Sequence, residues 1–111
     1  MPKRGGSLPD PSTRNHETER LIGLLQRSAP ALAQRYQVRS IGIFGSYARR
    51  QQHHGSDLDV LVDFSDPPSL LKFIEMENHL SDLLGVKVDL VMRDALRPGI
   101  RERILREVIA L

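Results

Sequence analysis

The sequence predicts an α/β domain with a small mixed β-sheet and helices packed on one face of the sheet. Three short apolar runs with the spacing of strands lie at residues 38–44, 57–64 and 86–92. Around them, apolar residues recur at the intervals of amphipathic helices. In the second run, every second residue from Leu58 to Phe64 is apolar, so one strand face is continuous and needs helices to cover it.

The composition is that of one globular domain. A chain of 111 residues buries a core but has no room for a second one. The absence of cysteine excludes disulfides, thiolate metal sites and a cysteine nucleophile, so any metal must be held by oxygen or imidazole. No apolar run has the length of a membrane span and no signal-peptide pattern opens the chain, so we expect a cytoplasmic protein. The scarcity of aromatic residues argues against direct nucleic-acid binding, which uses stacking platforms.

The N-terminal third is expected to hold a tail and two helices. Residues 1–14 are rich in proline, glycine and charge, as disordered tails are, which leaves residues 15–111 as the domain. The first helix is expected from near Asn15. Its core-facing residues have helical spacing: Thr18, Leu21, Ile22 and Leu25. Ser28 is expected to cap a second short helix that carries Pro30 in its first turn.

The middle of the chain alternates strands and helices. After the strand at 38–44 we expect a short helix at 46–51, and then a loop that leads to the second strand. A proline pair then precedes a long helix at 69–84, which Gly85 ends. Its expected core residues are Leu70, Phe73, Met76, Leu80 and Leu83 or Leu84.

The last part of the chain is predicted to be helical. After the third strand, Pro98 and Gly99 interrupt the chain, and a helix is expected at 100–110. Its expected apolar face consists of Ile100, Ile104, Leu105, Val108 and Ile109.

Two signals at a fixed separation carry the chemistry. Gly45 and Ser46 follow the first strand and open a helix, an arrangement that offers free backbone N–H groups to a phosphate. Asp57 and Asp59 follow after ten intervening residues, at the head of the second strand. Residues two apart on a strand share a face with their Cα atoms roughly 6.5–7 Å apart, so both carboxylates can bind Mg²⁺. Together the two signals predict a nucleoside triphosphate and a metal.

The same segments resemble a known family. Residues 44–49 (FGSYAR), 56–62 (SDLDVLV) and 85–91 (GVKVDLV) are similar to the minimal nucleotidyltransferase (MNT) branch of the DNA polymerase β-type nucleotidyltransferases. That branch includes antitoxins paired with HEPN-domain ribonucleases. The resemblance covers residues 17–111 and implies a polymerase β-like core. One departure is Arg50, where the family often has glycine.

The resemblance also implies roles for individual residues. It makes Asp89 a third carboxylate, which joins Asp57 and Asp59 in holding two Mg²⁺ ions and takes a proton from the attacking hydroxyl. The alternative for Asp89 is a surface charge on an edge strand. Gly45 and Ser46 are expected at the phosphates of ATP, although Ser46 has the alternative of an ordinary helix cap.

Five further side chains with possible chemical roles lie near these motifs. Arg49 is expected to bind the nucleotide. The alternative for both Arg49 and Arg50 is that their side chains are simply solvated. His53 and His54 are interpreted as an inert loop pair, because Mg²⁺ prefers oxygen ligands. Asp63 is interpreted as structural or surface.

The expected activity is transfer of AMP from ATP to a hydroxyl with release of pyrophosphate. The resemblance implies that the acceptor is a tyrosine of a HEPN ribonuclease toxin, which would make the chain an antitoxin and a component of a hetero-oligomer. A domain of this size needs a partner to complete the acceptor side, which favours a protein acceptor. Two alternatives stay open: a non-catalytic antitoxin that covers its partner, and an aminoglycoside-type nucleotidyltransferase of small molecules.

Overall fold

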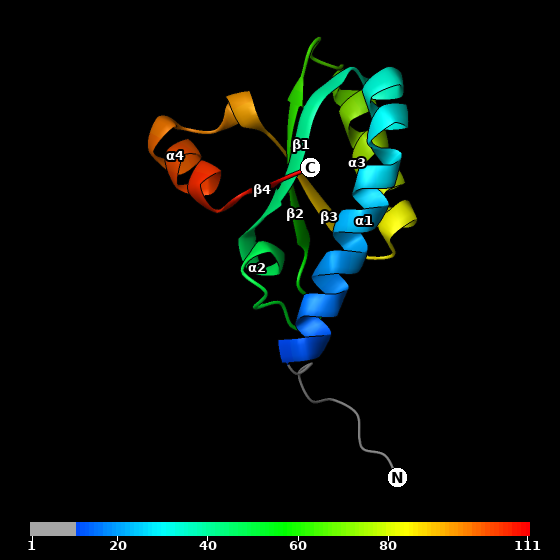
Figure 1. Cartoon of the computed structure of the whole chain (residues 1–111). Coiled ribbons are helices and arrows are strands. Elements are labelled where there is room, and N and C mark those ends of the chain that lie inside the picture. The colour runs from blue at the N-terminus through cyan, green and yellow to red at the C-terminus, as the bar shows by residue number, and fades with distance from the viewer. Residues whose placement is uncertain (1–10) are drawn as a thin grey trace.

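The computed structural model describes residues 11–111, with side chains from residue 16 onward. A long helix leads into a sheet whose strands are separated by three further helices (Figure 1). The elements are α1 (Pro11–Tyr36), β1 (Val38–Phe44), α2 (Gly45–Ala48), β2 (Leu58–Phe64), α3 (Leu70–Leu84), β3 (Val88–Met92), the 3-10 turn η1 (Arg93–Ala95), α4 (Pro98–Glu107) and β4 (Ile109–Ala110).

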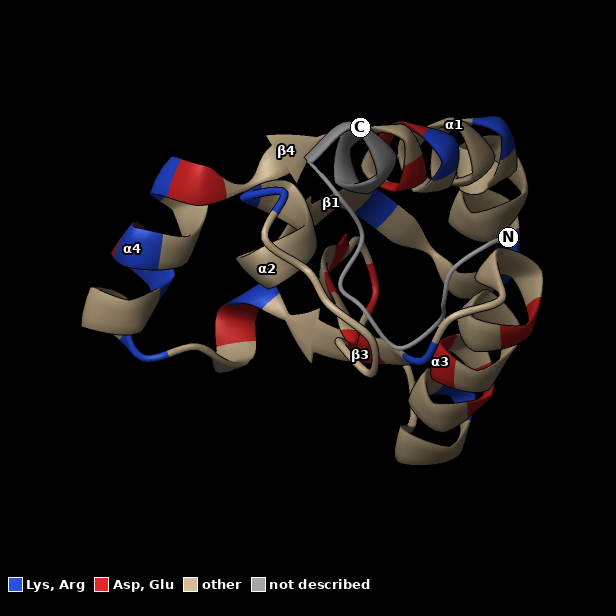
Figure 2. Ribbon diagram, turned by 90° about the horizontal axis from the view of Figure 1, so that it is seen from below, with Lys and Arg blue, Asp and Glu red and all other residues tan. Residues whose placement is uncertain are grey.

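The sheet is mixed, and its four strands have the order β3-β2-β1-β4. β2 runs parallel to β3, whereas β1 is antiparallel to both β2 and β4. Helices α1 and α3 lie side by side against one face of the sheet, and α4 stands on the other side of the molecule (Figures 1 and 2). The predicted fold class is therefore confirmed, with a fourth strand that the sequence did not indicate.

The core lies between the sheet and the pair α1 and α3. Each of these helices presents one stripe of fully buried side chains, and alternate residues of β1, β2 and β3 meet them. This is the packing that the apolar face of the second strand predicted. The central residues of the core are Leu21, Leu25, Leu32, Tyr36, Ile43, Leu58, Val60, Val62, Met76, Leu80, Leu84 and Val88.

The first two predicted helices are one continuous helix, so the predicted break at Ser28 is wrong. Pro30 lies inside α1, where it removes a backbone hydrogen bond. Packing explains why the helix continues, because Leu25 and Leu32 are both buried on the same face, on either side of the proline. Tertiary contacts thus outweigh the local preference of Pro30 for a helix start.

The predicted tail also needs correction. Helix α1 begins at Pro11, four residues before the expected start at Asn15, so residues 11–14 are helical. Proline is well suited to the first turn of a helix because its missing N–H would have no partner there. Residues 1–10, the remainder of the expected tail, lie outside the described residues.

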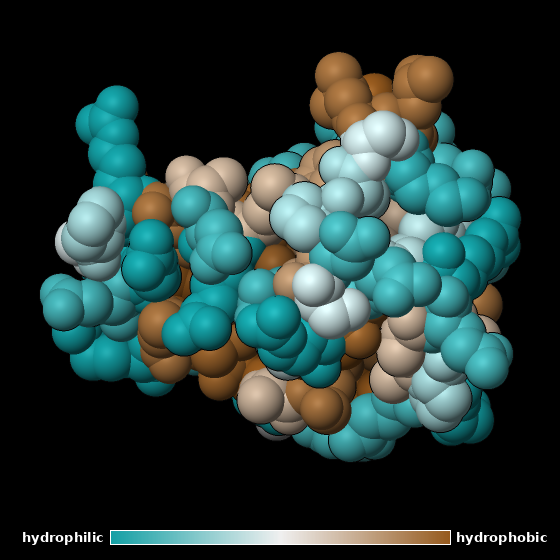
Figure 3. Space-filling model, turned by 90° about the horizontal axis from the view of Figure 1, so that it is seen from above, coloured by the Kyte–Doolittle hydropathy of each residue, from teal (hydrophilic) through white to brown (hydrophobic). Residues whose placement is uncertain are grey.

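Helix α3 ends at the predicted Gly85 but has a narrower buried face than expected. The Ser69 hydroxyl accepts a hydrogen bond from the Lys72 backbone N–H at 3.2 Å, and Gly85 ends the helix with a left-handed φ of 72°. The prediction that Leu70 is a core residue is wrong, since 73% of it is exposed. Leu70 lies in the first turn, at the margin of the Met76, Leu80 and Leu84 stripe. A hydrophobic patch projects from the surface at this end of the molecule (Figure 3).

The last predicted helix is shorter and less buried than expected. Helix α4 ends at Glu107, after which the chain reverses and Ile109 and Ala110 pair with β1. Every residue of α4 keeps part of its surface exposed, and Ile100 is 42% exposed. The predicted apolar face is therefore not a core face, because β4 ties the chain to the sheet edge and α4 lies apart from the α1 and α3 layer.

We expect Pro30→Ala to stabilise the protein. The substitution restores the backbone N–H that the helix interior lacks and removes the clash of the proline ring with the preceding turn, and Pro30 is exposed, so packing is unchanged. The expected gain in the free energy of unfolding is about 1–3 kcal/mol, measured by urea denaturation. Arg27→Ala, at an exposed position on the same helix, is the control. An unchanged Pro30→Ala protein would mean that α1 accommodates the ring without cost.

Candidate active site

Three carboxylates lie at one end of β2 and β3. Asp57 directly precedes β2, Asp59 is the second residue of β2, and Asp89 is the second residue of β3. In the parallel pairing of these strands, Asp59 is the register partner of Asp89, so the two side chains leave the same face of neighbouring strands. Acidic segments accordingly lie close to the label of β3 in Figure 2. Residues 30 apart in the sequence are thus brought together by strand register.

The electrostatics of Asp59 reflect this crowding. Burial and the negative charges of Asp89 and Asp57 raise the pKa of Asp59 to about 6, against an opposing effect of Arg49. Asp57 pairs loosely with Lys87, whose Nζ lies 3.9 Å from Asp57 Oδ2 and whose side chain is largely exposed. This cluster carries an excess of negative charge that a divalent cation would neutralise.

The chemistry of these donors fits Mg²⁺. All three side chains supply oxygen, and Mg²⁺ is usually held by one or two carboxylates together with water and substrate phosphates. Within residues 16–111, no three acidic or histidine side chains are already gathered closely enough to hold a metal on their own. Such an incomplete set of protein ligands is expected of a metal site that a bound nucleotide completes with its phosphate oxygens.

Gly45 allows Asp59 to reach its position. Gly45 has φ = 74°, and a Cβ atom there would collide with the Asp59 carboxylate. Register explains the contact, because Phe44, the residue before Gly45, is the partner of Asp59 across β1 and β2. The sequence predicted Gly45 at the phosphates of ATP, whereas in the structure the Asp59 carboxylate occupies the space where a side chain at position 45 would lie.

Helix α2 is a single turn, shorter than the predicted helix at 46–51. Phe44 is its N-cap residue and Ser46 is its second residue. The alternative in which Ser46 is an ordinary N-cap is therefore wrong. The Thr18 hydroxyl donates a buried hydrogen bond of 3.0 Å to the Tyr47 carbonyl, which fixes this turn to α1.

Arg49 is paired with a residue that sequence analysis did not single out. Its Nη1 lies 3.0 Å from Glu107 Oε1 and 3.2 Å from Glu107 Oε2. The Gly45 backbone N–H donates a 2.8 Å hydrogen bond to the same carboxylate. Glu107 is 58 residues from Arg49 and belongs to a helix that was predicted to continue past it, so neither spacing nor pattern could indicate this contact.

Arg50 has a backbone conformation that glycine adopts more readily than other residues. It has φ = 57°, in the left-handed region that costs a side chain roughly 1–2 kcal/mol. Its guanidinium bonds to Glu19 Oε2 at 2.7 Å and to the Ala48 carbonyl at 3.3 Å. The departure from the family pattern therefore changes the side chain and its contacts while the loop keeps a glycine-like conformation.

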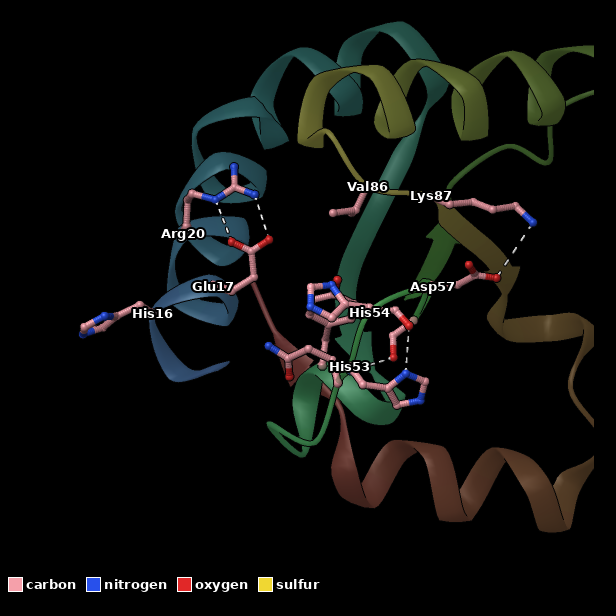
Figure 4. A pocket seen from close by; sticks show the side chains of 12 residues that line it. His16, Glu17, Arg20, His53, His54, Asp57, Val86 and Lys87 are labelled. Carbon is pink, nitrogen blue, oxygen red and sulfur yellow. Dashed lines mark hydrogen bonds and ion pairs between the residues drawn. The ribbon is translucent and has the colours of Figure 1, made fainter. Parts of the chain in front are cut away.

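A hollow of about 750 Å³ lies on the Asp57 side of the carboxylates. Its walls come from the start of α1, the loop before β2 and the residues before β3, and His53, His54 and Lys87 are among its lining residues (Figure 4). His53 is held within its own loop, since its Nδ1 lies 2.9 Å from the His54 carbonyl and its N–H donates to the Ser56 hydroxyl. The volume is in the range of small-ligand sites.

Asp63 lies on the same strand face as Asp59, further along β2. It is buried and lies 3.5 Å from Arg39 Nη1 and 3.9 Å from Arg93 Nη1. A buried carboxylate between two guanidinium groups ties β1 to η1. Its predicted role as a structural residue fits these contacts.

The sequence profile of the nucleotidyltransferase domain matches residues 25–111. The chain belongs to this family. A relative from Thermococcus cleftensis, named protein adenylyltransferase MntA, is 50% identical over 91 residues, which cover 82% of this chain and 92% of that protein. This nucleotidyltransferase domain is thus an enzyme of nucleotidyl transfer.

Solved structures agree with the family. A candidate minimal nucleotidyltransferase superposes on this nucleotidyltransferase domain with a TM-score of 0.64 at 36% identity, covering 96% of this chain and all of that one. A crystal structure of a toxin–antitoxin with AMP-PNP gives a TM-score of 0.63 at 25% identity, covering 84% of this chain and 70% of that one. Among the helices of residues 11–111, none has the length and apolarity to cross a membrane.

We expect Gly45→Ala to destabilise the nucleotidyltransferase domain more than Gly85→Ala does. Both positions have positive φ, which costs alanine roughly 1–2 kcal/mol. Only the Cβ at position 45 meets another group, the Asp59 carboxylate. Urea denaturation measures both losses, and Gly45→Ala combined with Asp59→Ala should recover the difference between them. Equal losses for the two single variants would contradict the contact.

Stability should also depend on pH through Asp59. Because its pKa is raised from 3.8 to about 6, the folded protein binds more protons than the unfolded chain between these values. The contribution of Asp59 to stability therefore falls as the pH rises through this window.

Asp59→Asn tests this dependence. The variant should be more stable than the wild type at about pH 7.5, by about 1–2 kcal/mol after allowance for partial hydration, and of similar stability near pH 3.5. Thermal unfolding at the two pH values measures the difference, with the exposed Asp66→Asn as control. A gain of equal size at both pH values would show that charge is not the cause.

Proposed function

We propose that the protein transfers AMP from ATP to a hydroxyl group of a partner protein, with Mg²⁺ held at the three carboxylates. The observation that carries this proposal is the register that sets Asp59 beside Asp89, next to Asp57. Three carboxylates at one edge of a sheet repel a triphosphate unless cations lie between them. The cluster is therefore suited to a nucleotide that arrives with Mg²⁺.

The residues of the proposed site have different tasks. Asp57 and Asp59 would hold the ions, and Asp89 would assist one of them. Two Mg²⁺ ions, when bound, would neutralise phosphate oxygens and lower the pKa of the attacking hydroxyl. Backbone N–H groups of Gly45 and Ser46 would donate hydrogen bonds to the phosphates, and Arg49 would add a positive charge once it leaves Glu107.

The reaction needs one proton transfer and one displacement at phosphorus. The acceptor oxygen forms a bond to the α-phosphorus, the bond from that phosphorus to the bridging oxygen breaks, and pyrophosphate leaves. Asp89 takes the proton of the acceptor. Its position supports this task, because Asp89 is exposed on the edge strand β3, where a second molecule can approach.

The hollow beside Asp57 supports a place for the nucleoside. Its volume of about 750 Å³ exceeds what a nucleoside needs, and it opens next to the carboxylates that would hold the phosphates. His53, His54 and Lys87 offer polar contacts along its walls. We assign the adenosine of ATP to this side of the site.

The acceptor is proposed to be a tyrosine of a HEPN ribonuclease toxin. The 50% identical relative is named a protein adenylyltransferase, and the 25% identical structure is a toxin–antitoxin. Modification of a tyrosine would add a bulky anion to the toxin and silence it, so the protein would act as an antitoxin that contacts its substrate in a hetero-oligomer. The cytoplasm, which supplies ATP and Mg²⁺, is the proposed location.

Asp89→Asn tests the proposed function. Wild type and variant are incubated with ATP, Mg²⁺ and a HEPN-domain toxin, and the mass of that protein is followed over time. We expect Asp89→Asn to keep most of its ATP affinity and to lose about 10²–10⁴-fold in transfer rate, the usual range for a lost general base. Asp94→Asn, an exposed carboxylate on η1, is the matched control and should react at the wild-type rate.

Three other outcomes would each contradict the proposal. Transfer by Asp89→Asn at the wild-type rate would make Asp89 a surface charge of an edge strand. Inhibition of the toxin by the wild type without any change in mass would indicate a non-catalytic antitoxin. Modification of an aminoglycoside, with the HEPN protein unchanged, would indicate a small-molecule enzyme.

A further inference from the structure

Apolar side chains gather on the surface at the start of α3 (Figure 3). Three of them lie within five residues of one another and remain in solvent: Leu70 is 73% exposed, Leu71 80% and Ile74 42%. Soluble monomeric proteins rarely expose large apolar patches, which usually mark surfaces that another molecule covers. We call these three residues the α3 patch.

A hollow of about 490 Å³ lies beside the α3 patch. Leu70 and Phe73 of α3 line it together with Val91 and Met92 at the end of β3. The Phe73 ring packs edge-on against Phe64 of β2, with 6.3 Å between the ring centroids. One wall is thus fixed by the core, so the hollow is a preformed place for an apolar side chain of another molecule.

The hollow adjoins the proposed catalytic carboxylate. Asp89 and Val91 are two residues apart on β3, so their side chains share a face and their Cα atoms are roughly 6.5–7 Å apart. A protein that inserts an apolar side chain beside Val91 therefore brings its neighbouring residues within reach of Asp89. The apolar surface and the carboxylate can bind one and the same partner.

The outer edge of β3 favours contact through side chains over the addition of a strand. The Val88 N–H donates to the Ser81 hydroxyl at 3.0 Å, and the Leu90 N–H donates to the Glu77 carboxylate at 2.8 Å. An added strand would need these same N–H groups. Two side chains of α3 thus close this part of the edge, and the α3 patch and the hollow are left to hold a partner.

Charge favours a basic partner over a second copy of this chain. The carboxylates of Asp57, Asp59 and Asp89 lie next to the hollow, and a two-fold contact through the α3 patch would bring the acidic clusters of both copies toward each other. A ribonuclease offers the opposite charge, because it holds the phosphates of RNA with cationic side chains.

We propose that the acceptor ribonuclease docks on the α3 patch and inserts an apolar side chain into the hollow, which sets its basic surface against the acidic cluster and its acceptor hydroxyl at Asp89. The proposal rests on the proposed function and names the surface that selects the acceptor. Different residues then determine affinity and chemistry: the α3 patch sets the affinity for the toxin, and Asp89 sets the rate of transfer. Docking involves no covalent change.

Calorimetric binding of a HEPN-domain toxin in the absence of ATP tests the docking surface. Leu71→Ser should bind the toxin about tenfold more weakly than the wild type, because it removes a large apolar contact. Ala95→Phe should weaken binding by a similar factor, because Ala95 lines the hollow and the added ring would fill it. Leu71 and Ala95 are both exposed, so neither substitution alters the core.

Ile74→Ser and Ile100→Ser form a matched pair. Both side chains are 42% exposed, but Ile100 lies on α4 and outside the α3 patch. Ile74→Ser should weaken toxin binding about fivefold, whereas Ile100→Ser should stay within about twofold.

The kinetics of AMP transfer give a second readout. Leu71→Ser should raise the KM for the toxin about tenfold and leave kcat within about twofold, the reverse of what Asp89→Asn does. Its affinity for ATP with Mg²⁺ should equal that of the wild type. A general loss of structure would lower kcat and ATP affinity as well, and that result would overturn the assignment of Leu71 to docking.

The outcomes separate this inference from the proposed function. Wild-type affinity in Leu71→Ser overturns the docking surface even if AMP transfer proceeds, and wild-type affinity in Ala95→Phe overturns insertion into the hollow. The expected binding pattern without AMP transfer supports the docking surface and overturns the proposed function. A wild-type dimer that Leu71→Ser dissociates, with toxin binding unchanged, shows that the patch joins two copies and overturns the inference. If Ala95→Phe does not fold, the comparison of Ile74→Ser with Ile100→Ser decides.

Discussion

The site depends on the parallel register between β2 and β3. Side chains on neighbouring strands share a face only when their positions correspond, and a shift by one residue would turn Asp89 away from Asp59 and into the helical layer. The buried residues Val88 and Leu90 prevent that shift, because they alternate with Asp89 and must face α3. The same alternation of apolar and charged residues along β3 therefore determines both the packing of the core and the arrangement of the carboxylates. This explains how so small a domain keeps three like charges together.

Gly45 is the second point on which the site depends. Its missing side chain admits the Asp59 carboxylate, and its N–H binds the Glu107 carboxylate. Three segments from different parts of the chain thus meet at one residue: the end of β1, the start of β2 and the end of α4. A larger residue at position 45 would disturb all three, so the glycine serves the arrangement of the protein as well as the approach of a ligand.

Local sequence determined much of this fold in advance. The bounds of β1, the end of α3 at Gly85 and the alternation in β2 were predicted correctly, because each follows from neighbouring residues. Contacts distant in the sequence could not be predicted in this way. Pro30 indicated a helix start until the packing of Leu25 and Leu32 was known, and the pairing of β4 with β1 required three-dimensional proximity. The carboxylates Asp57, Asp59 and Asp89 were selected from motif and resemblance, whereas Glu107 has no local signal and became visible only through its partners.

The short strand β4 has a consequence for how the protein behaves at high concentration. It lies so close to β1 that a Cβ atom on Gly42 would be only 2.8 Å from the Ile109 carbonyl oxygen. Two residues of β4 are all that pair with this side of β1 among residues 11–111. Without them, a seven-residue strand would offer unpaired N–H and C=O groups to any other chain, which is the usual origin of edge-to-edge association. The close fit at Gly42 thus keeps this side of β1 covered by β4.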